Sequence, residues 1–295
     1  MIDRRKRGYM NFFIDAEKTA ILDVGMNYDA PESISALREL LNGRKLDNII
    51  LSHSHYDHMG ALSEYRKAFP EATVIASGKT ASVFEREGAR KVIRELSDVA
   101  EKYYLKDGEK GPVFDESGLY VDRIVEDGDI IDLGSDQFRV YATPGHTDCS
   151  ISLFDEKNGD LLLSEATGVY VCPEFVEMTF LKSFAQCGQS VDLCDSLNAK
   201  RLYIPHYGEF KEGTPHDYFE LCRASLVRLK AFFLKEGDEG KSDEEILEDF
   251  TDFSYRRYIV PNNGQIIDAF LANARPMLKT MKREFPEHFI KREVQ

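Results

Sequence analysis

The sequence predicts a mixed α/β protein that ends in a helical part. An apolar run at residues 48–51, a helical pattern at 61–69 and a second apolar run at 72–76 follow one another in the order of a strand–helix–strand unit. Short strand patterns separated by Asp-Gly and Asn-Gly turns fill residues 121–164. Helical spacing of apolar residues then dominates from residue 215 to residue 285. These patterns predict a core of sheets and helices, followed by helices alone.

The boundary between the two parts is expected near residue 210. It gives an α/β core over residues 1–210 and a helical extension over residues 211–295, and no internal repeat or low-complexity linker is visible. We expect the extension to form a wall of the substrate pocket, together with Tyr207 and residues 170–180. Core packing is the favoured alternative for the aromatic side chains of that segment.

The remaining elements follow from the same spacing rules. Aromatic and apolar runs at residues 9–15 and 20–25 predict a hairpin, and helical spacing over residues 31–41 predicts a helix that Asn42-Gly43 ends. Charged helical patterns over residues 79–106 predict one or two exposed helices. Short strands of antiparallel type are expected at residues 121–125, 129–133, 138–143, 150–154 and 161–164. Later elements are expected as a helix at 175–197, a strand at 201–205 and helices at 215–235, 243–258 and 263–285.

Composition and charge exclude several classes of partner. The formal charge of −14 disfavours nucleic acid, because no basic face is available to replace the counterions of a phosphate backbone. The chain contains no run of about eighteen apolar residues, so no membrane span is expected. The basic start at residues 4–7 lacks the apolar centre of a signal peptide. The 5 cysteines show no paired spacing, which is typical of free thiols in a reducing compartment. We therefore expect a cytoplasmic protein that acts on a small molecule.

Three histidines and an aspartate are crowded into one loop between a strand and a helix. His53, His55, Asp57 and His58 fall within six residues, directly after the apolar run at 48–51. Imidazole nitrogens and a carboxylate at this spacing can converge on metal ions. A polar loop that happens to hold three histidines is the alternative, but His is sparse elsewhere in this chain. The loop therefore predicts a metal site at the carboxyl end of a strand, where open α/β sheets bind their ligands.

Three later residues each follow a predicted strand in the same way. His146 lies in a Pro-Gly turn, Glu165 follows the apolar run before it, and His206 follows the strand at 201–205. Taken alone, each fits a surface turn or a solvated side chain. Taken with the histidine loop, they complete a set of five imidazoles and two carboxylates at strand ends. That number of ligands suits two metal ions better than one.

These motifs resemble the signature of the metallo-β-lactamase superfamily. The signature is His-x-His-x-Asp-His, then Pro-Gly-His, then an acidic residue after a strand, then a His after a last strand. The similarity covers residues 9 to about 210. It implies a four-layer αββα sandwich with two divalent ions, as zinc, iron or manganese. The corresponding residues are His53, His55, Asp57 and His58 for the first motif, followed by His146, Glu165 and His206.

The resemblance also implies a role for each ligand. One ion is held by His53, His55 and His146, and the other by Asp57, His58 and His206. The acidic residue bridges both ions, and a carboxylate corresponding to Asp23 supports the histidine loop through hydrogen bonds. The family usually has Asp at the bridging position, whereas this chain has Glu165. Because its carboxylate reaches about 1.5 Å further, Glu165 either bridges from a displaced strand end or binds a single ion.

The resemblance implies a metal-dependent hydrolase, with a thioester or an ester as the first expectation for its substrate. A hydroxide bridging the two ions would be the nucleophile, oriented by Asp57. An iron-dependent oxidoreductase, similar to flavodiiron proteins or persulfide dioxygenases, is the alternative, because such a ligand set accepts iron as readily as zinc. A non-catalytic sensor, in which the metal site has a structural role, is a third interpretation. An apolar face on the last helices is also compatible with a homodimer.

Overall fold

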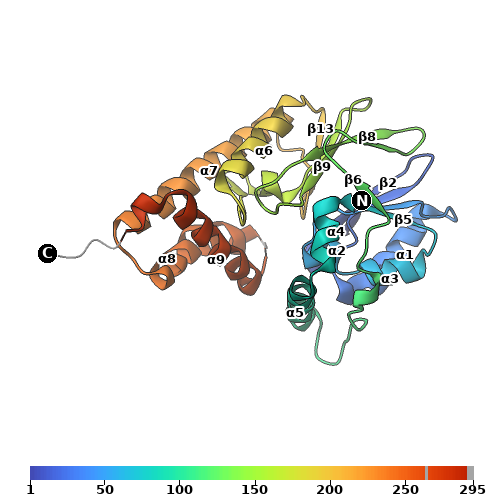
Figure 1. Cartoon of the computed structure of the whole chain (residues 1–295), viewed down its shortest axis with the longest axis horizontal. Helices are drawn as coiled ribbons and strands as arrows, with labels where there is room; N and C mark the ends of the chain where they lie inside the picture. The colour runs from blue at the N-terminus through green and yellow to red at the C-terminus, as the bar shows by residue number, and fades with distance from the viewer. Residues whose placement is uncertain (263–264, 291–295) are drawn as a thin grey trace. The chain divides into compact units, whose positions relative to one another are not determined.

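The computed structural model describes residues 1–262 and 265–290, which form two compact units. The first unit comprises Met1–Ala142 and Cys149–Leu162, and the second comprises Thr143–Asp148 and the chain from Leu163 onward. Sheets and helices are combined in the earlier part of the chain, and helices α7, α8 and α9 follow one another in its orange-to-red part (Figure 1). The prediction of a mixed α/β fold with a helical C-terminal region is confirmed. The division at residue 210 stays a prediction.

The first unit is built on a six-stranded sheet with strands in sequence order. Its first three strands are antiparallel neighbours, and the last four run parallel to one another. The predicted hairpin and the predicted strand–helix–strand unit are both confirmed in this sheet. The strands are β1 (Ile2–Arg4), β2 (Tyr9–Ile14), β3 (Ala20–Leu22), β4 (Asn48–Ile50), β5 (Thr73–Ser77) and β6 (Arg123–Val125).

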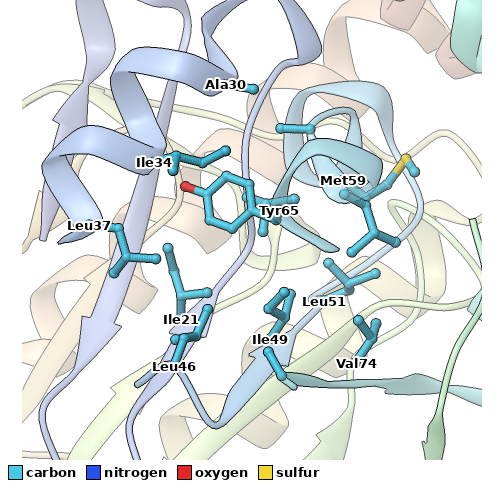
Figure 2. Close-up of a cluster of buried hydrophobic side chains, with 14 of the residues drawn as sticks. Ile21, Ala30, Ile34, Leu37, Leu46, Ile49, Leu51, Met59, Tyr65 and Val74 are labelled. Atoms are coloured by element: carbon cyan, nitrogen blue, oxygen red, sulfur yellow. The ribbon is translucent and has the colours of Figure 1, made fainter. Parts of the chain in front are cut away.

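Strand β4 lies at the centre of this sheet and carries the histidine loop at its carboxyl end. Ile49, Ile50 and Leu51 are fully buried, as expected for a strand flanked by parallel neighbours on both sides. On one face, side chains of α1 (Ala30–Leu41) and α3 (Leu62–Ala68) pack against it, and Figure 2 shows Leu37 and Tyr65 in this cluster. The buried cluster fixes the strand end from which the loop begins.

The helices of the first unit begin and end where the sequence changes character. Pro31 stands in the first turn of α1, and Asn42 ends that helix in the left-handed conformation, with φ of 47°. Residues 56–59 of the histidine loop are helical, although only a loop was predicted there. The other helices are η1 (Arg5–Arg7), η2 (Asn27–Asp29), α2 (Tyr56–Met59), α4 (Gly78–Glu85), α5 (Glu87–Tyr104) and η3 (Glu116–Gly118).

Four strands of the first unit pair antiparallel in the second sheet. They are β7 (Ile130–Asp132), β8 (Gln137–Ala142), β9 (Ile151–Asp155) and β10 (Asp160–Leu162). The strand at residues 121–125 was predicted as part of this antiparallel group, and that assignment is wrong. Strand β6 instead pairs in parallel with β5, since the long α4–α5 connection returns the chain to the edge of the first sheet.

The second unit begins with short strands and continues with long helices. The prediction of a helix from residue 175 is wrong for its first part, because Phe175–Glu177 forms strand β12 against β11 (Val169–Cys172). Helix α6 (Phe184–Ser196) starts only where the Ser183 hydroxyl accepts a hydrogen bond from the backbone N–H of Gln186. The remaining elements are η4 (Glu165–Thr167), β13 (Arg201–Ile204), β14 (Gly208–Glu209), α7 (Pro215–Asp238), α8 (Asp243–Phe250), η5 (Thr251–Ile259), η6 (Val260–Asn262), α9 (Ile267–Glu284) and η7 (Pro286–His288).

The helices of the second unit share an aromatic core. Phe233 of α7, Phe250 of α8 and Phe270 of α9 are buried, with ring centroids 4.9 and 5.2 Å apart along the series. A capping box between Thr214 and Asp217 starts α7. The last helix was predicted from residue 263, a start that lies outside the described residues. Among the residues that the structure describes, no helix has the length and apolar character needed to cross a bilayer.

Leu37→Ala should lower the free energy of unfolding by about 2–5 kcal/mol, because a fully buried side chain of the first core leaves a cavity. Leu40→Ala on the same helix is the matched control, since Leu40 is 41% exposed and should change stability little. Urea unfolding followed by circular dichroism measures both. Equal midpoint shifts for the two variants would contradict the packing described above.

Candidate metal centre

The histidine loop is fixed to the first unit by the carboxylate of Asp23. This residue directly follows β3 and has φ of 61°, a left-handed conformation that is uncommon outside Gly. Its backbone N–H donates to the carbonyl of Ile50, so two neighbouring strand ends are joined here. The backbone N–H groups of Val24 and Gly25 both donate to the carbonyl of His58, at 2.8 and 3.1 Å. The loop is therefore held by backbone as well as side-chain bonds.

Asp23 sets the tautomers of two histidines. His58 Nδ1 lies 2.8 Å from Asp23 Oδ2, so the imidazole donates its Nδ1–H to the carboxylate. The hydroxyl of Ser52 donates to the same oxygen at 2.7 Å and lies 3.0 Å from His53 Nδ1, which then donates to the hydroxyl. Both imidazoles consequently carry the lone pair on Nε2, which is the form required of a metal ligand.

The other two residues of the loop are less buried than these histidines. His55 and Asp57 are half-buried, whereas His53 and His58 are buried. The candidate ligand atoms of His53 and His55 lie within 4.8 Å of one another, and Asp57 Oδ2 lies 3.9 Å from His58 Nε2. The structure thus brings the four predicted residues of the first unit into two adjacent pairs.

In the second unit, a tight turn positions His146. Gly145 has φ of 129°, and a Cβ atom there would lie 2.4 Å from the backbone nitrogen of Cys187, so only Gly fits. Its carbonyl accepts hydrogen bonds from Lys182 and Ser183. His146 Nδ1 donates to the carbonyl of Thr179 at 2.7 Å, so Nε2 is the nitrogen directed toward the candidate centre.

Glu165 lies between the two histidines of the second unit. Its Oε2 is 2.7 Å from His146 Nε2, and its Oε1 is 2.6 Å from His206 Nε2. Burial by itself would raise the pKa of Glu165, but the charges and hydrogen bonds of His146 and His206 outweigh this effect and hold the pKa well below its usual range. Each carboxylate oxygen is therefore directed at a different imidazole.

His206 occupies a strained position at the end of β13. Its φ of 60° is left-handed, in a turn where the N–H of Tyr207 donates to the carbonyl of Ile204. Strain of this kind costs about 1–3 kcal/mol and is typical of functional sites. The conformation at His206 repeats that at Asp23, so each unit holds one left-handed residue of the candidate centre.

The donor chemistry in both units fits metal ions. Each unit combines imidazoles with a carboxylate, and in three of the imidazoles, His53, His58 and His146, a hydrogen bond at Nδ1 makes Nε2 the ligand atom. The structure brings together His53, His55, Asp57 and His58 within the first unit, and His146, Glu165 and His206 within the second. Nitrogen and oxygen donors of this kind suit zinc, iron and manganese.

Three supporting residues were not predicted from the sequence. Ser52 and Thr179 orient histidines, as described above, and Glu177 is a second buried acid of the second unit. Burial, together with the negative charge of Glu165, raises the pKa of Glu177 to about 8, and Gln265 donates a hydrogen bond to its carboxyl group. Ser52 stands inside the predicted motif and could have been suspected. Thr179 and Glu177 lie beyond any local pattern.

A family model described as the metallo-beta-lactamase superfamily matches residues 7–206 of this chain. The chain belongs to the metallo-beta-lactamase superfamily. The resemblance inferred from the motifs is therefore confirmed, and the fold is that of the superfamily with a C-terminal helical region. The match includes every candidate ligand, from His53 to His206.

Several curated proteins are similar to this chain. A diflavin flavoprotein of Nostoc is 25% identical over 57% of this chain and 25% of its own length. A hydroxyacylglutathione hydrolase of Buchnera aphidicola is 25% identical over 62% of this chain and 54% of its own length. A solved metallo-beta-lactamase family protein of Thermus thermophilus has a TM-score of 0.61, with 18% identity over 94% of this chain and 88% of that chain. This chain spans less than two thirds of the length of the Nostoc and Buchnera relatives.

Asp23→Asn should lower metal affinity by about 10- to 100-fold. Asp23 accepts hydrogen bonds with both carboxylate oxygens, whereas an amide keeps one acceptor oxygen and places an NH2 donor at the other position, so it loses part of the set that orients His53 and His58. Asn tolerates the left-handed conformation of this position, so the fold should be retained. Competition with a chromophoric chelator measures the affinity, and Asp98→Asn on the exposed side of α5 is the control. Unchanged affinity in Asp23→Asn would show that the carboxylate does not tune the ligands.

Proposed function

We propose that this chain is a dinuclear metal-dependent hydrolase that cleaves thioesters or esters. The observation that carries the proposal is the position of Glu165, whose two oxygens face two different imidazoles at 2.7 and 2.6 Å. A carboxylate placed in this way can offer one oxygen to each of two ions. This arrangement supports a bridging role despite the extra methylene relative to Asp.

In the proposed centre, one ion is bound by His53, His55 and His146, and the other by Asp57, His58 and His206. Membership of the superfamily supports this assignment, as does the agreement between the ligand atom that each hydrogen bond selects and the atom a metal requires. The two carboxylates, Asp57 and Glu165, supply only part of the charge of two divalent cations. The site would therefore keep a net positive charge, which favours a bound anion.

When bound, such a metal pair would supply a hydroxide at neutral pH as the nucleophile. Asp57 is less buried than His53 and His58, and its Oδ2 lies 3.9 Å from His58 Nε2. A half-buried carboxylate at the edge of the centre can orient the attacking water and carry its proton to the leaving group. Asp57 is therefore the proposed catalytic residue.

A groove of about 490 Å³ in the second unit is the proposed substrate-binding surface. Tyr170, Phe210 and Leu221 contribute apolar walls, and Tyr170 packs at 4.8 Å on Tyr207, which follows the ligand His206. Tyr170, Phe175 and Phe180 themselves are buried, which agrees with the core-packing reading of this segment. The rim carries Glu212, Asp217 and Glu220. This acidic rim favours an acyl group or thiol without negative charge.

An iron-dependent oxidoreductase is the second candidate function. The similarity to the Nostoc diflavin flavoprotein favours it, and the ligand set accepts iron as readily as zinc. The hydrolase is preferred because flavodiiron proteins carry Glu at the second histidine position of the motif, whereas this chain has His55. Thioester chemistry is in turn supported by the hydroxyacylglutathione hydrolase relative.

Paired assays on one preparation test the function. Protein purified without added metal should contain two divalent ions per chain and should hydrolyse acyl thioesters of uncharged thiols without oxygen consumption. Elemental analysis, thiol release and an oxygen electrode measure the three quantities. Oxygen uptake with iron in the site and no thiol release would favour the oxidoreductase, and saturated metals with neither activity would favour a sensor.

Asp57→Asn should abolish hydrolysis and weaken the binding of one ion, whereas Glu165→Gln should reduce the binding of both. The reason is that the proposed centre gives Glu165 to both ions and Asp57 to only one. Metal stoichiometry by elemental analysis, with circular dichroism as a check on folding, separates the two variants. If Glu165→Gln lost one ion only, the bridging assignment would fail while a hydrolase with a single-ion carboxylate would remain possible.

A further inference from the structure

Helix α5 (Glu87–Tyr104) is strongly amphipathic, but its apolar face is wider than the surface that it covers. Ile93, Ser97 and Ala100 point into the first unit and are buried. Next to them, Val92 is 52% exposed, Val99 is 41% exposed and Tyr103 is 59% exposed. These apolar side chains therefore lie at the surface of the described structure, beside the face that anchors the helix.

The exposed residues follow a regular spacing. Val92, the half-buried Leu96, Val99 and Tyr103 are separated by four, three and four residues. This 4-3-4 spacing places all four in one stripe and is the pattern by which two helices pack along a seam. The stripe is therefore shaped to receive another helix.

Charges along one edge of the stripe indicate which helix. Glu95 and Lys102 lie on the same edge, seven residues apart, and carry opposite charges. At 1.5 Å per residue they are separated by about 10 Å along the helix. In an antiparallel pair of identical helices, Glu95 of each copy comes next to Lys102 of the other. In a parallel pair each residue stays level with its own copy, so neither charge meets its opposite.

We propose that α5 pairs antiparallel with α5 of a second copy of this chain. A two-fold axis between residues 97 and 98 sets Leu96 opposite Val99 of the second copy and Val92 opposite Tyr103. Each Glu95 then lies about 3 Å along the helix from the level of Lys102 of the other copy, within reach of these long side chains. The two Glu95–Lys102 pairs lie along one edge of the seam, one on each side of the axis. Such a contact is isologous, as most homodimer contacts are. It uses the first unit alone and is independent of the proposed metal chemistry.

The size of the contact predicts a weak dimer. A helix of 18 residues is about 27 Å long, and one helix per copy gives an interface at the small end of the range for specific complexes. The within-chain pair between Lys91 and Glu95, at 3.8 Å, is exposed and does not prevent Glu95 from turning to a second copy. We therefore expect monomers and dimers in an equilibrium that depends on concentration.

Sedimentation velocity over a wide range of protein concentration tests the proposal. The weight-average sedimentation coefficient of the full chain should rise with concentration, and Val99→Glu should keep the protein monomeric by placing two carboxylates near the axis. Val227→Glu is the matched control, because Val227 is 69% exposed on α7 of the second unit. A chain that is monomeric at every concentration would overturn the proposal. A dimer that persists in Val99→Glu would also overturn it, and would favour pairing through another surface, such as the last helices.

Exchanging the charges of Glu95 and Lys102 tests the antiparallel register through substitutions at exposed side chains alone. Glu95→Lys and Lys102→Glu should each weaken dimerisation about tenfold, the equivalent of about 1.4 kcal/mol. The double variant E95K/K102E should restore it, since the pairs re-form with their signs reversed. Failure of the double variant to recover would overturn the antiparallel arrangement. At a protein concentration at which the unmodified chain is monomeric, thermal unfolding by circular dichroism should be the same for all of these variants, because the altered side chains are exposed.

Discussion

The carboxylate of Asp23 is the constraint on which the candidate centre of the first unit depends. It accepts hydrogen bonds from Ser52 and His58 at 2.7 and 2.8 Å, and through Ser52 it also orients His53. A buried acid is costly unless its oxygens are satisfied, and here the two side-chain bonds that satisfy it also position candidate ligands. The left-handed backbone at this residue is the local cost of bringing the carboxylate under the loop.

The second unit solves the same problem with different groups. A backbone carbonyl, that of Thr179, does for His146 what a carboxylate does for His58. A carbonyl carries no charge, and Glu165, between two imidazoles, is the one carboxylate among the candidate ligands of this unit. Each unit therefore holds its own ligands through its own hydrogen bonds. Ligands that are fixed before a metal arrives lose less conformational entropy when it binds.

The sequence was sufficient to identify the candidate ligands but not the groups that orient them. His53, His55, Asp57 and His58 could be predicted because metal-ligand spacing is local, and Glu165 and His206 because both follow apolar runs. Thr179 could not be predicted, because it reaches His146 across 33 residues of chain. The strand at Phe175–Glu177 was mistaken for a helix, since a short apolar run has no period of its own and only its pairing with β11 defines it. The parallel pairing of β6 was missed for the same reason.

The replacement of Asp by Glu at position 165 is consistent with the geometry around it. Residue 165 opens the short helix η4, where the hydroxyl of Ser164 accepts a hydrogen bond from the backbone N–H of Ala166 and fixes the turn. His146 and His206 are fixed in turn, one by Thr179 and the other by its left-handed backbone. Because the turn at residue 165 and the positions of His146 and His206 are fixed, the side chain at 165 must span the distance from its own backbone to both imidazoles. Glu does so with both oxygens within 2.7 Å of an imidazole nitrogen, and an Asp at the same place, shorter by about 1.5 Å, would need the turn at Ser164 to move inward.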